Sequence, residues 1–60
     1  MSEHWLEHPS RLWSVRFQVV GDKVRLTKKH GPDWVHEETL DIDAARRRYT
    51  WYVGLGYQRW

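Results

Sequence analysis

The sequence lacks cysteine, so it can form neither a disulfide nor a thiolate metal site. It also lacks any apolar run near the ~20 residues that span a membrane. Its first residues, Met1 to His4, have neither the basic nor the apolar segment of a secretory signal. We therefore expect a cytoplasmic protein. A chain of 60 residues forms one domain with a marginal core, which a partner or large aromatic side chains must supplement.

Aromatic residues are the unusual part of the composition. Five Trp, three Tyr and one Phe make up 15% of the chain. Each buries roughly 150–250 Å², so a few of them replace many aliphatic residues in a small core. The composition is too aromatic for a disordered segment. Pro9-Ser10 interrupts the chain early, and we expect an N-terminal arm over residues 1–10 and a single domain over 11–60.

A β-hairpin is the clearest element that the sequence predicts. Residues 13–20 and 23–28 alternate between apolar and polar side chains, which is the period of a strand. Gly21-Asp22 between them suits a two-residue type II′ turn. This turn pairs Phe17 with Leu26, and a slip by one residue would mix the two faces. One face of the hairpin then carries Val15, Phe17, Val19, Val24 and Leu26.

A third strand over 34–40 and a helix over 42–54 complete the predicted fold. The strand is expected at an edge of the sheet, with Trp34 on the same face as His36, Glu38 and Leu40. Asp41 or Asp43 is expected as the N-cap of the helix. Gly54 and Gly56 are the candidate C-caps, and Gly56 is favoured because the apolar Leu55 precedes it. The fold class is α+β: a three-stranded antiparallel sheet followed by one C-terminal helix. The helix should bury Ile42, Ala45, Tyr49, Tyr52 and Val53, and residues 57–60 should fold back on the core.

Catalytic and metal-binding patterns are missing from the sequence. Gly54-Leu55-Gly56 lacks the third glycine of a phosphate loop and follows a helix. Glu37 and Glu38 are adjacent, so on a strand they point to opposite faces and cannot act as an acid–base pair. We expect no enzymatic activity and no cofactor. The four histidines lack the spacing of a zinc module, and we expect no metal site at His4, His8, His30 or His36.

Protein binding is the function that the sequence favours. Nine aromatic residues exceed what a core of this size hides well, and Trp and Arg often anchor interfaces. The outward side of the helix brings together Arg47, Arg48 and Trp51. Trp13, at the open end of the hairpin, and Trp60 are further candidates for exposure, whereas Trp34 is expected in the core. The partner is another protein, with a second copy of the chain, as a homodimer, among the alternatives.

Nucleic-acid binding is the alternative. The solvent side of the hairpin offers Arg16, Lys23, Arg25 and Lys29, and Arg46 to Arg48 add charge on the helix. A neighbouring Trp or Tyr can stack on unpaired bases. The net charge of only +2 and the acidic stretch 33–43 weigh against this function.

Several short motifs resemble a known group of proteins. They are Trp5-Leu6, Val15-Arg16-Phe17, Ala44-Ala45-Arg46 with Tyr49, Gly56-Tyr57 and Trp60. Together they resemble short cyanobacterial proteins that close with an Ala-rich helix, a Gly-aromatic pair and a final Trp. The resemblance implies a bacterial cytoplasmic accessory protein, and it implies no activity and no functional residues.

Overall fold

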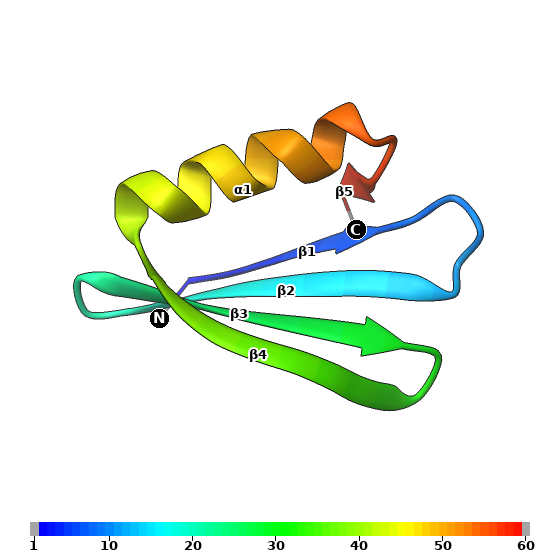
Figure 1. Ribbon diagram of the computed structural model, residues 1–60, viewed down its shortest axis with the longest axis horizontal. Coiled ribbons are helices and arrows are strands. Elements are labelled where there is room, and N and C mark those ends of the chain that lie inside the picture. The colour runs from blue at the N-terminus through cyan, green and yellow to red at the C-terminus, as the bar shows by residue number, and fades with distance from the viewer. Residues whose placement is uncertain (1, 60) are drawn as a thin grey trace.

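A five-stranded antiparallel sheet packs one face against a single helix in the computed structural model, which describes residues 2–59 (Figure 1). The strand order is β4-β3-β2-β1-β5. In chain order the elements are β1 (Glu3–Glu7), β2 (Trp13–Val20), β3 (Lys23–His30), β4 (Asp33–Asp41), α1 (Ile42–Gly54) and β5 (Gln58–Arg59). The α+β class, the antiparallel sheet and the helix after it are as the sequence predicts, and β4 is an edge strand.

The predicted number of three strands is wrong, because two short segments near the chain ends also join the sheet. Residues 3–7, which fall in the expected arm, form β1, and Leu6 pairs with Val15 of β2. Leu6 is 0% exposed. Residues 58–59 then pair with β1 as β5. Strands this short present one or two inward side chains each, so their alternation is too brief to mark them as strands.

The central hairpin has the predicted register. Phe17 pairs with Leu26, Val19 with Val24 and Val20 with Lys23. Gly21 has φ of 63°, which glycine adopts without the steric cost that a Cβ would add, and Asp22 has no positive φ. These are the φ signs of a type II′ turn. The turn and the apolar alternation therefore specify the same pairing.

A β-bulge in β4 changes which residues of this strand share a face. Lys28 pairs with His36 and Lys29 with Trp34, so Val35 is the extra residue. Trp34 consequently shares a face with Lys29, opposite to His36, Glu38 and Leu40. The predicted common face of these four residues is wrong, since a bulge reverses the alternation beyond it. Trp34 is 47% exposed and does not enter the core.

The helix begins and ends where the sequence predicts. Asp41 is the N-cap, and its Oδ1 accepts a hydrogen bond of 2.7 Å from the Ala44 N–H. At the other end Gly56 has φ of 102° and follows the C-cap, Leu55. The Gly56 N–H donates to the Val53 carbonyl at 3.0 Å, and the Tyr57 N–H donates to the Tyr52 carbonyl at 3.1 Å. This is a Schellman motif, and it turns Tyr57 back onto Tyr52, with ring centroids 4.9 Å apart.

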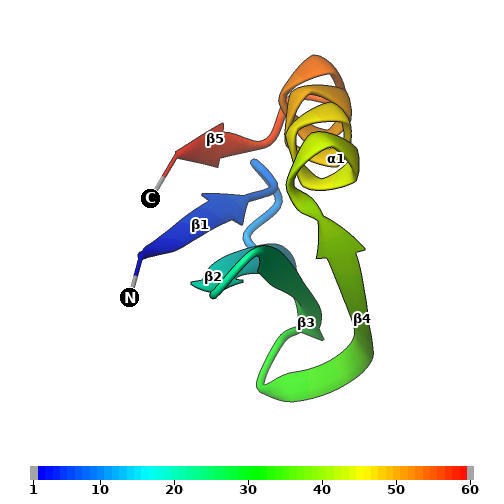
Figure 2. The same cartoon turned by 90° about the vertical axis from the view of Figure 1, so that its left-hand side faces the viewer.

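The core lies between the helix and the concave face of the sheet, which curls around the helix (Figure 2). Six of the ten residues predicted for the core are buried there, and Val19 and Tyr49 are half-buried. Ile42 and Val53 are exposed, contrary to the prediction, because the contact stripe of the helix is limited to Ala45, Tyr49 and Tyr52. The buried apolar residues are Leu6, Val15, Phe17, Val24, Leu26, Ala45, Tyr52 and Tyr57.

The convex face of the sheet carries no helix or strand above it within residues 2–59 (Figure 2). We call it the open face. By register it displays the side chains that alternate with the core residues, including Trp5, Arg16, Thr27 and Trp34. Helix α1, at 13 residues, is too short to cross a membrane, and no other helix occurs among residues 2–59.

Phe17→Ala is expected to destabilise the protein by about 3–5 kcal/mol, a typical cost of removing a buried Phe. Phe17 is 4% exposed and contacts the rings of Tyr49 and Tyr52 from the sheet side. Urea denaturation followed by circular dichroism measures the loss. Val20→Ala, at a 46% exposed position on the same strand, is the control and should change little. A Phe17→Ala variant as stable as the control would contradict the packing.

Replacing either of two glycines at the end of the helix by alanine should change the stability of the protein, in opposite directions for the two positions. Gly56→Ala should destabilise by about 1–2 kcal/mol, because an L-residue is strained at its left-handed φ. Gly54→Ala should stabilise by about 0.5–1 kcal/mol, since Gly54 is helical and a Cβ there meets nothing within 4 Å. Thermal unfolding of both variants checks the pair, and changes of equal sign would rule out the Schellman geometry.

Candidate binding sites

A cleft runs between the C-terminal half of helix α1 and the sheet, and we call it the helix cleft. Trp13 lies at one end of it, 4.3 Å between ring centroids from His30 and with Lys28 Nζ 4.6 Å from its ring centroid. Trp51 lies opposite on the helix, is 56% exposed, and contacts Tyr52 edge-on. The cleft has a volume of about 400 Å³, and its lining residues are Trp13, Lys28, Val35, His36, Arg48, Trp51 and Tyr52.

A second hollow, of about 570 Å³, continues from the helix cleft along the outer side of the helix. Ala44, Arg47, Arg48 and Trp51 line it, so Arg48 and Trp51 belong to both. Helical spacing explains this, because residues three and four apart lie on one side. The structure thus brings together four of the five residues predicted for protein binding: Trp13, Arg47, Arg48 and Trp51. The fifth, Trp60, lies outside the described residues.

Glu38 of β4 connects the edge of the sheet to the helix through its carboxylate. Its Oε2 is hydrogen-bonded to His36 Nε2, and its Oε1 is 3.2 Å from Arg48 Nη2. The hydrogen bond from His36 lowers the pKa of Glu38; burial opposes the shift, and the positive charge of Arg48 adds to it. Burial also raises the pKa of Tyr52, and the nearby charge of Arg48 offsets part of this increase. Arg48 is therefore held in place, whereas Arg47 has no ion-pair partner among residues 2–59.

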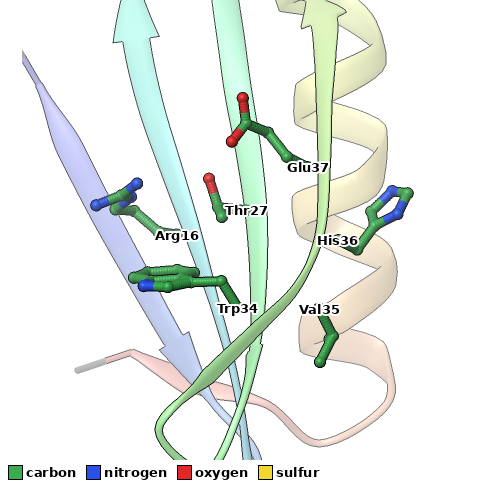
Figure 3. Close-up of a pocket in the computed structure, with 6 residues that line it drawn as sticks. All are labelled: Arg16, Thr27, Trp34, Val35, His36 and Glu37. Carbon is green, nitrogen blue, oxygen red and sulfur yellow. The ribbon is translucent and has the colours of Figure 1, made fainter.

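The open face carries a second cluster, formed by Trp5, Arg16 and Trp34. The Cζ atom of Arg16 is 4.7 Å from the ring centroid of Trp34 and 5.7 Å from that of Trp5. The two indole rings are 5.9 Å apart, and Lys29 Nζ is 5.3 Å from the centroid of Trp34. Figure 3 shows the Trp34 ring beside the Arg16 side chain, with Thr27 and Glu37 on the adjoining strands. We call this cluster the indole–arginine platform.

All four hairpin residues of the nucleic-acid alternative lie on the open face. Arg16, Lys23, Arg25 and Lys29 alternate with the core residues of β2 and β3. Arg46 to Arg48 belong to the helix on the other side of the sheet, so the seven basic residues do not form one surface. Four carboxylates share the open face by register, namely those of Glu3, Glu7, Glu37 and Asp41.

Trp5 and Trp34 are the site residues that sequence reasoning missed. Trp5 falls in the segment expected as an arm, and Trp34 was expected in the core. The one signal for Trp34 was its neighbour: Trp34 and Val35 are both large and apolar, and adjacent residues of a regular strand cannot both face the core. The bulge at Val35 resolves that conflict by sending Trp34 to the open face.

The four histidines have four different environments. His36 pairs with Glu38, His30 stacks on Trp13, and His8 contacts Ser10 and the ring of Tyr57. His4 lines a separate apolar hollow with Phe17. Within residues 2–59, no three side chains of His, Asp or Glu gather closely enough to hold a metal ion. Glu37 and Glu38 point to opposite faces of the sheet and pair with different arginines, Arg25 and Arg48.

No protein-family model, curated protein or solved structure matches the chain. The resemblance to short cyanobacterial proteins therefore stays a prediction. The two candidate sites are therefore interpreted from their own chemistry.

The stabilising effect of Glu38 should depend on pH in a defined direction. Its pKa in the folded protein lies below the ordinary value of 4.5, so its contribution is complete above that pH. The contribution is lost as the pH falls through the folded pKa, because the neutral acid no longer pairs with His36 and Arg48. The free energy of unfolding of wild type minus Glu38→Gln should thus be positive at pH 7 and shrink toward zero in acid.

Urea titrations at a series of pH values measure this difference. Glu37→Gln is the control, since the Arg25–Glu37 pair is 3.7 Å long and both side chains are largely exposed. Exposed pairs of this kind contribute about 0–1 kcal/mol, so this control should differ little from wild type. A Glu38→Gln difference that stays constant across the pH range would contradict the assigned role of Glu38.

Proposed function

We propose that the protein is a non-catalytic binding module that holds a protein partner in the helix cleft. The observation that carries the proposal is the meeting of Trp13, Arg48 and Trp51 around one cleft, with Arg47 in the adjoining hollow. Interface hot spots are enriched in Trp and Arg, and their side chains lie in pockets that a partner can desolvate. Trp51 leaves more than half of its surface in water in the free protein, so a partner has much apolar area to cover.

The charges around the cleft favour an acidic partner segment. Lys28, Arg47 and Arg48 surround the two indoles, and Glu38 is already engaged with Arg48 and His36. A peptide with one apolar anchor between Asp or Glu residues would insert the anchor beside Trp51 and place its carboxylates near Arg47 and Lys28. Opposite potentials of this kind speed association and determine which partner fits.

A second copy of the chain is the other partner that this surface suits. Its residues 33–43 are acidic, and a small domain gains stability when a dimer buries more apolar area. The proposal places the module in the bacterial cytoplasm, in line with the resemblance to the short cyanobacterial proteins.

Selection of random displayed peptides on the immobilised protein tests the proposal. Wild type should enrich acidic peptides with one large apolar residue, and the Arg47→Glu/Trp51→Ala variant should bind the selected peptides at least about 30-fold more weakly, the equivalent of losing a hot spot of about 2 kcal/mol. The matched control is Arg25→Glu/Trp34→Ala, which makes the same chemical change on the open face and should retain binding.

Sedimentation over a range of protein concentrations distinguishes the two partners. A wild-type dimer that the Arg47→Glu/Trp51→Ala variant cannot form would identify the partner as a second copy. The cleft is not the binding site if that variant, shown to be folded by circular dichroism, binds the selected peptides as tightly as wild type. The absence of any enriched peptide together with a monomer at every concentration would refute protein binding itself.

A further inference from the structure

The open face holds a site that the helix cleft does not explain, because Arg16 and Trp34 lie on the other side of the sheet from the helix. The two sites adjoin along β4, where Val35 and His36 line both hollows. A hollow of about 480 Å³ borders the indole–arginine platform, within the usual range of about 300–1,000 Å³ for small-molecule sites. Its lining residues are Arg16, Thr27, Trp34, Val35, His36 and Glu37, from strands β2, β3 and β4 (Figure 3).

The two tryptophans of the platform lean toward each other over the middle of the sheet. Trp5 is on β1 and Trp34 on β4, with β2 and β3 between them, so their backbones are roughly 14 Å apart at the usual strand spacing. Their ring centroids are nevertheless only 5.9 Å apart. Trp5 is oriented by a hydrogen bond of 2.7 Å from its Nε1–H to Glu3 Oε1. Both indoles are thus brought over Arg16 without any helix to support them.

Two polar groups beneath the indoles lack partners. Arg16 and Thr27 are cross-strand neighbours, and both Arg16 Nε and Thr27 Oγ1 are covered without a hydrogen-bond partner among residues 2–59. Thr27 is only 3% exposed, which is unusual for a polar side chain on an uncovered sheet face. Covered polar groups of this kind cost free energy while they lack a hydrogen-bond partner. A ligand that donates to or accepts from them, after a small shift of the Arg16 side chain, would recover this free energy.

The charge of the platform favours an anion. None of the described carboxylates forms an ion pair with Arg16. Glu37 lines the hollow, but it is engaged with Arg25 at 3.7 Å. Lys29 adds a second cation beside Trp34. The local balance of Arg16, Arg25 and Lys29 against Glu37 and the Glu3 that bonds to Trp5 is therefore positive.

We infer that the indole–arginine platform binds unpaired nucleotides of a single-stranded nucleic acid. The exposed ring of Trp34 offers a stacking surface for a base, and Arg16 and Lys29 offer positive charge for the neighbouring phosphates. The Glu37 carboxylate lines the same hollow, where it can accept a hydrogen bond from the edge of the stacked base. An open sheet face carrying aromatic side chains is one of the surfaces on which proteins stack unpaired bases.

This ligand accounts for features that a protein partner at the helix cleft leaves unexplained. A base needs a flat aromatic surface, and a phosphate needs a nearby cation. The platform supplies both, because the charged groups of Arg16 and Lys29 lie 4.7 and 5.3 Å from the ring centroid of Trp34. Duplex DNA or RNA keeps its bases stacked on one another, so it cannot offer them to Trp34. The inference therefore requires a preference for single strands, which simple attraction to a polyanion does not produce.

Fluorescence anisotropy of labelled oligonucleotides of about ten nucleotides, within the ~4–16 typical of one single-strand site, tests the inference with the full chain. Separate arms use single-stranded RNA, single-stranded DNA, duplexes of the same sequences and heparin. Binding to RNA or DNA single strands should exceed binding to the duplexes. Affinity should fall between about 50 and about 200 mM salt, because phosphate contacts release counterions.

Four variants separate stacking on Trp34, the charge of Arg16 and the contribution of the helix cleft. Trp34→Ala should weaken single-strand binding about fivefold to hundredfold, the range for removing one stacking side chain, and Trp34→Phe should restore most of it. Arg16→Gln should lower the affinity and reduce the salt slope by about one phosphate contact. The matched control, Trp51→Ala in the helix cleft, should leave oligonucleotide binding unchanged, so failure at one site does not affect the result at the other.

Nuclear magnetic resonance titration of wild type gives a readout that needs no variant. The indole N–H of Trp34 and the amide of Thr27 should shift on addition of single-stranded oligonucleotide, whereas the indole N–H of Trp51 should not. The inference is overturned by absence of binding at low salt, by equal or tighter binding to duplex or heparin, or by a folded Trp34→Ala variant that binds like wild type. It is also overturned if the shifts cluster on the helix.

Discussion

A single helix of 13 residues covers only one face of a five-stranded sheet, and most other features of this small protein depend on that constraint. The covered face carries the compact apolar core, built around Phe17 and Leu26 from the hairpin and Tyr52 from the helix. The open face has no such cover within residues 2–59, so its side chains must shield one another. Two neighbouring indoles and the stem of an arginine do this, because both combine large apolar area with a polar end that tolerates water.

The bulge at Val35 distributes the aromatic residues between the two faces. Without it Trp34 would point into the space under the helix, together with His36 and Glu38. With it Trp34 joins Arg16 on the open face, while His36 and Glu38 remain beside Arg48 on the helix. One extra residue in an edge strand thus separates two clusters of different chemistry. Bulges often re-aim side chains in this way near binding sites.

The two proposed sites share residue types but differ in geometry. In the helix cleft, Trp13 and Trp51 stand on different elements with cations around them, which suits an irregular peptide with a bulky anchor. On the open face, the rings of Trp5 and Trp34 lie close together over the sheet, which suits a planar base. The sites adjoin along β4 at Val35 and His36, but Trp34 lines the open-face hollow and Trp51 lines the helix cleft, so substitutions at these two residues change different sites.

The sequence by itself determined the local elements of this protein. Apolar alternation with Gly21 specified the hairpin register, while Asp41 and Gly56 specified the helix ends, because these signals act between residues that are near in the chain. Helical spacing likewise grouped Arg47, Arg48 and Trp51 on one side. Only the tertiary structure decided the addition of β1 and β5 to the sheet, the outward position of Trp34, and the meeting of Trp13 with Trp51. These features depend on pairing between distant segments and on one bulge, and neither leaves a periodic signal in a sequence.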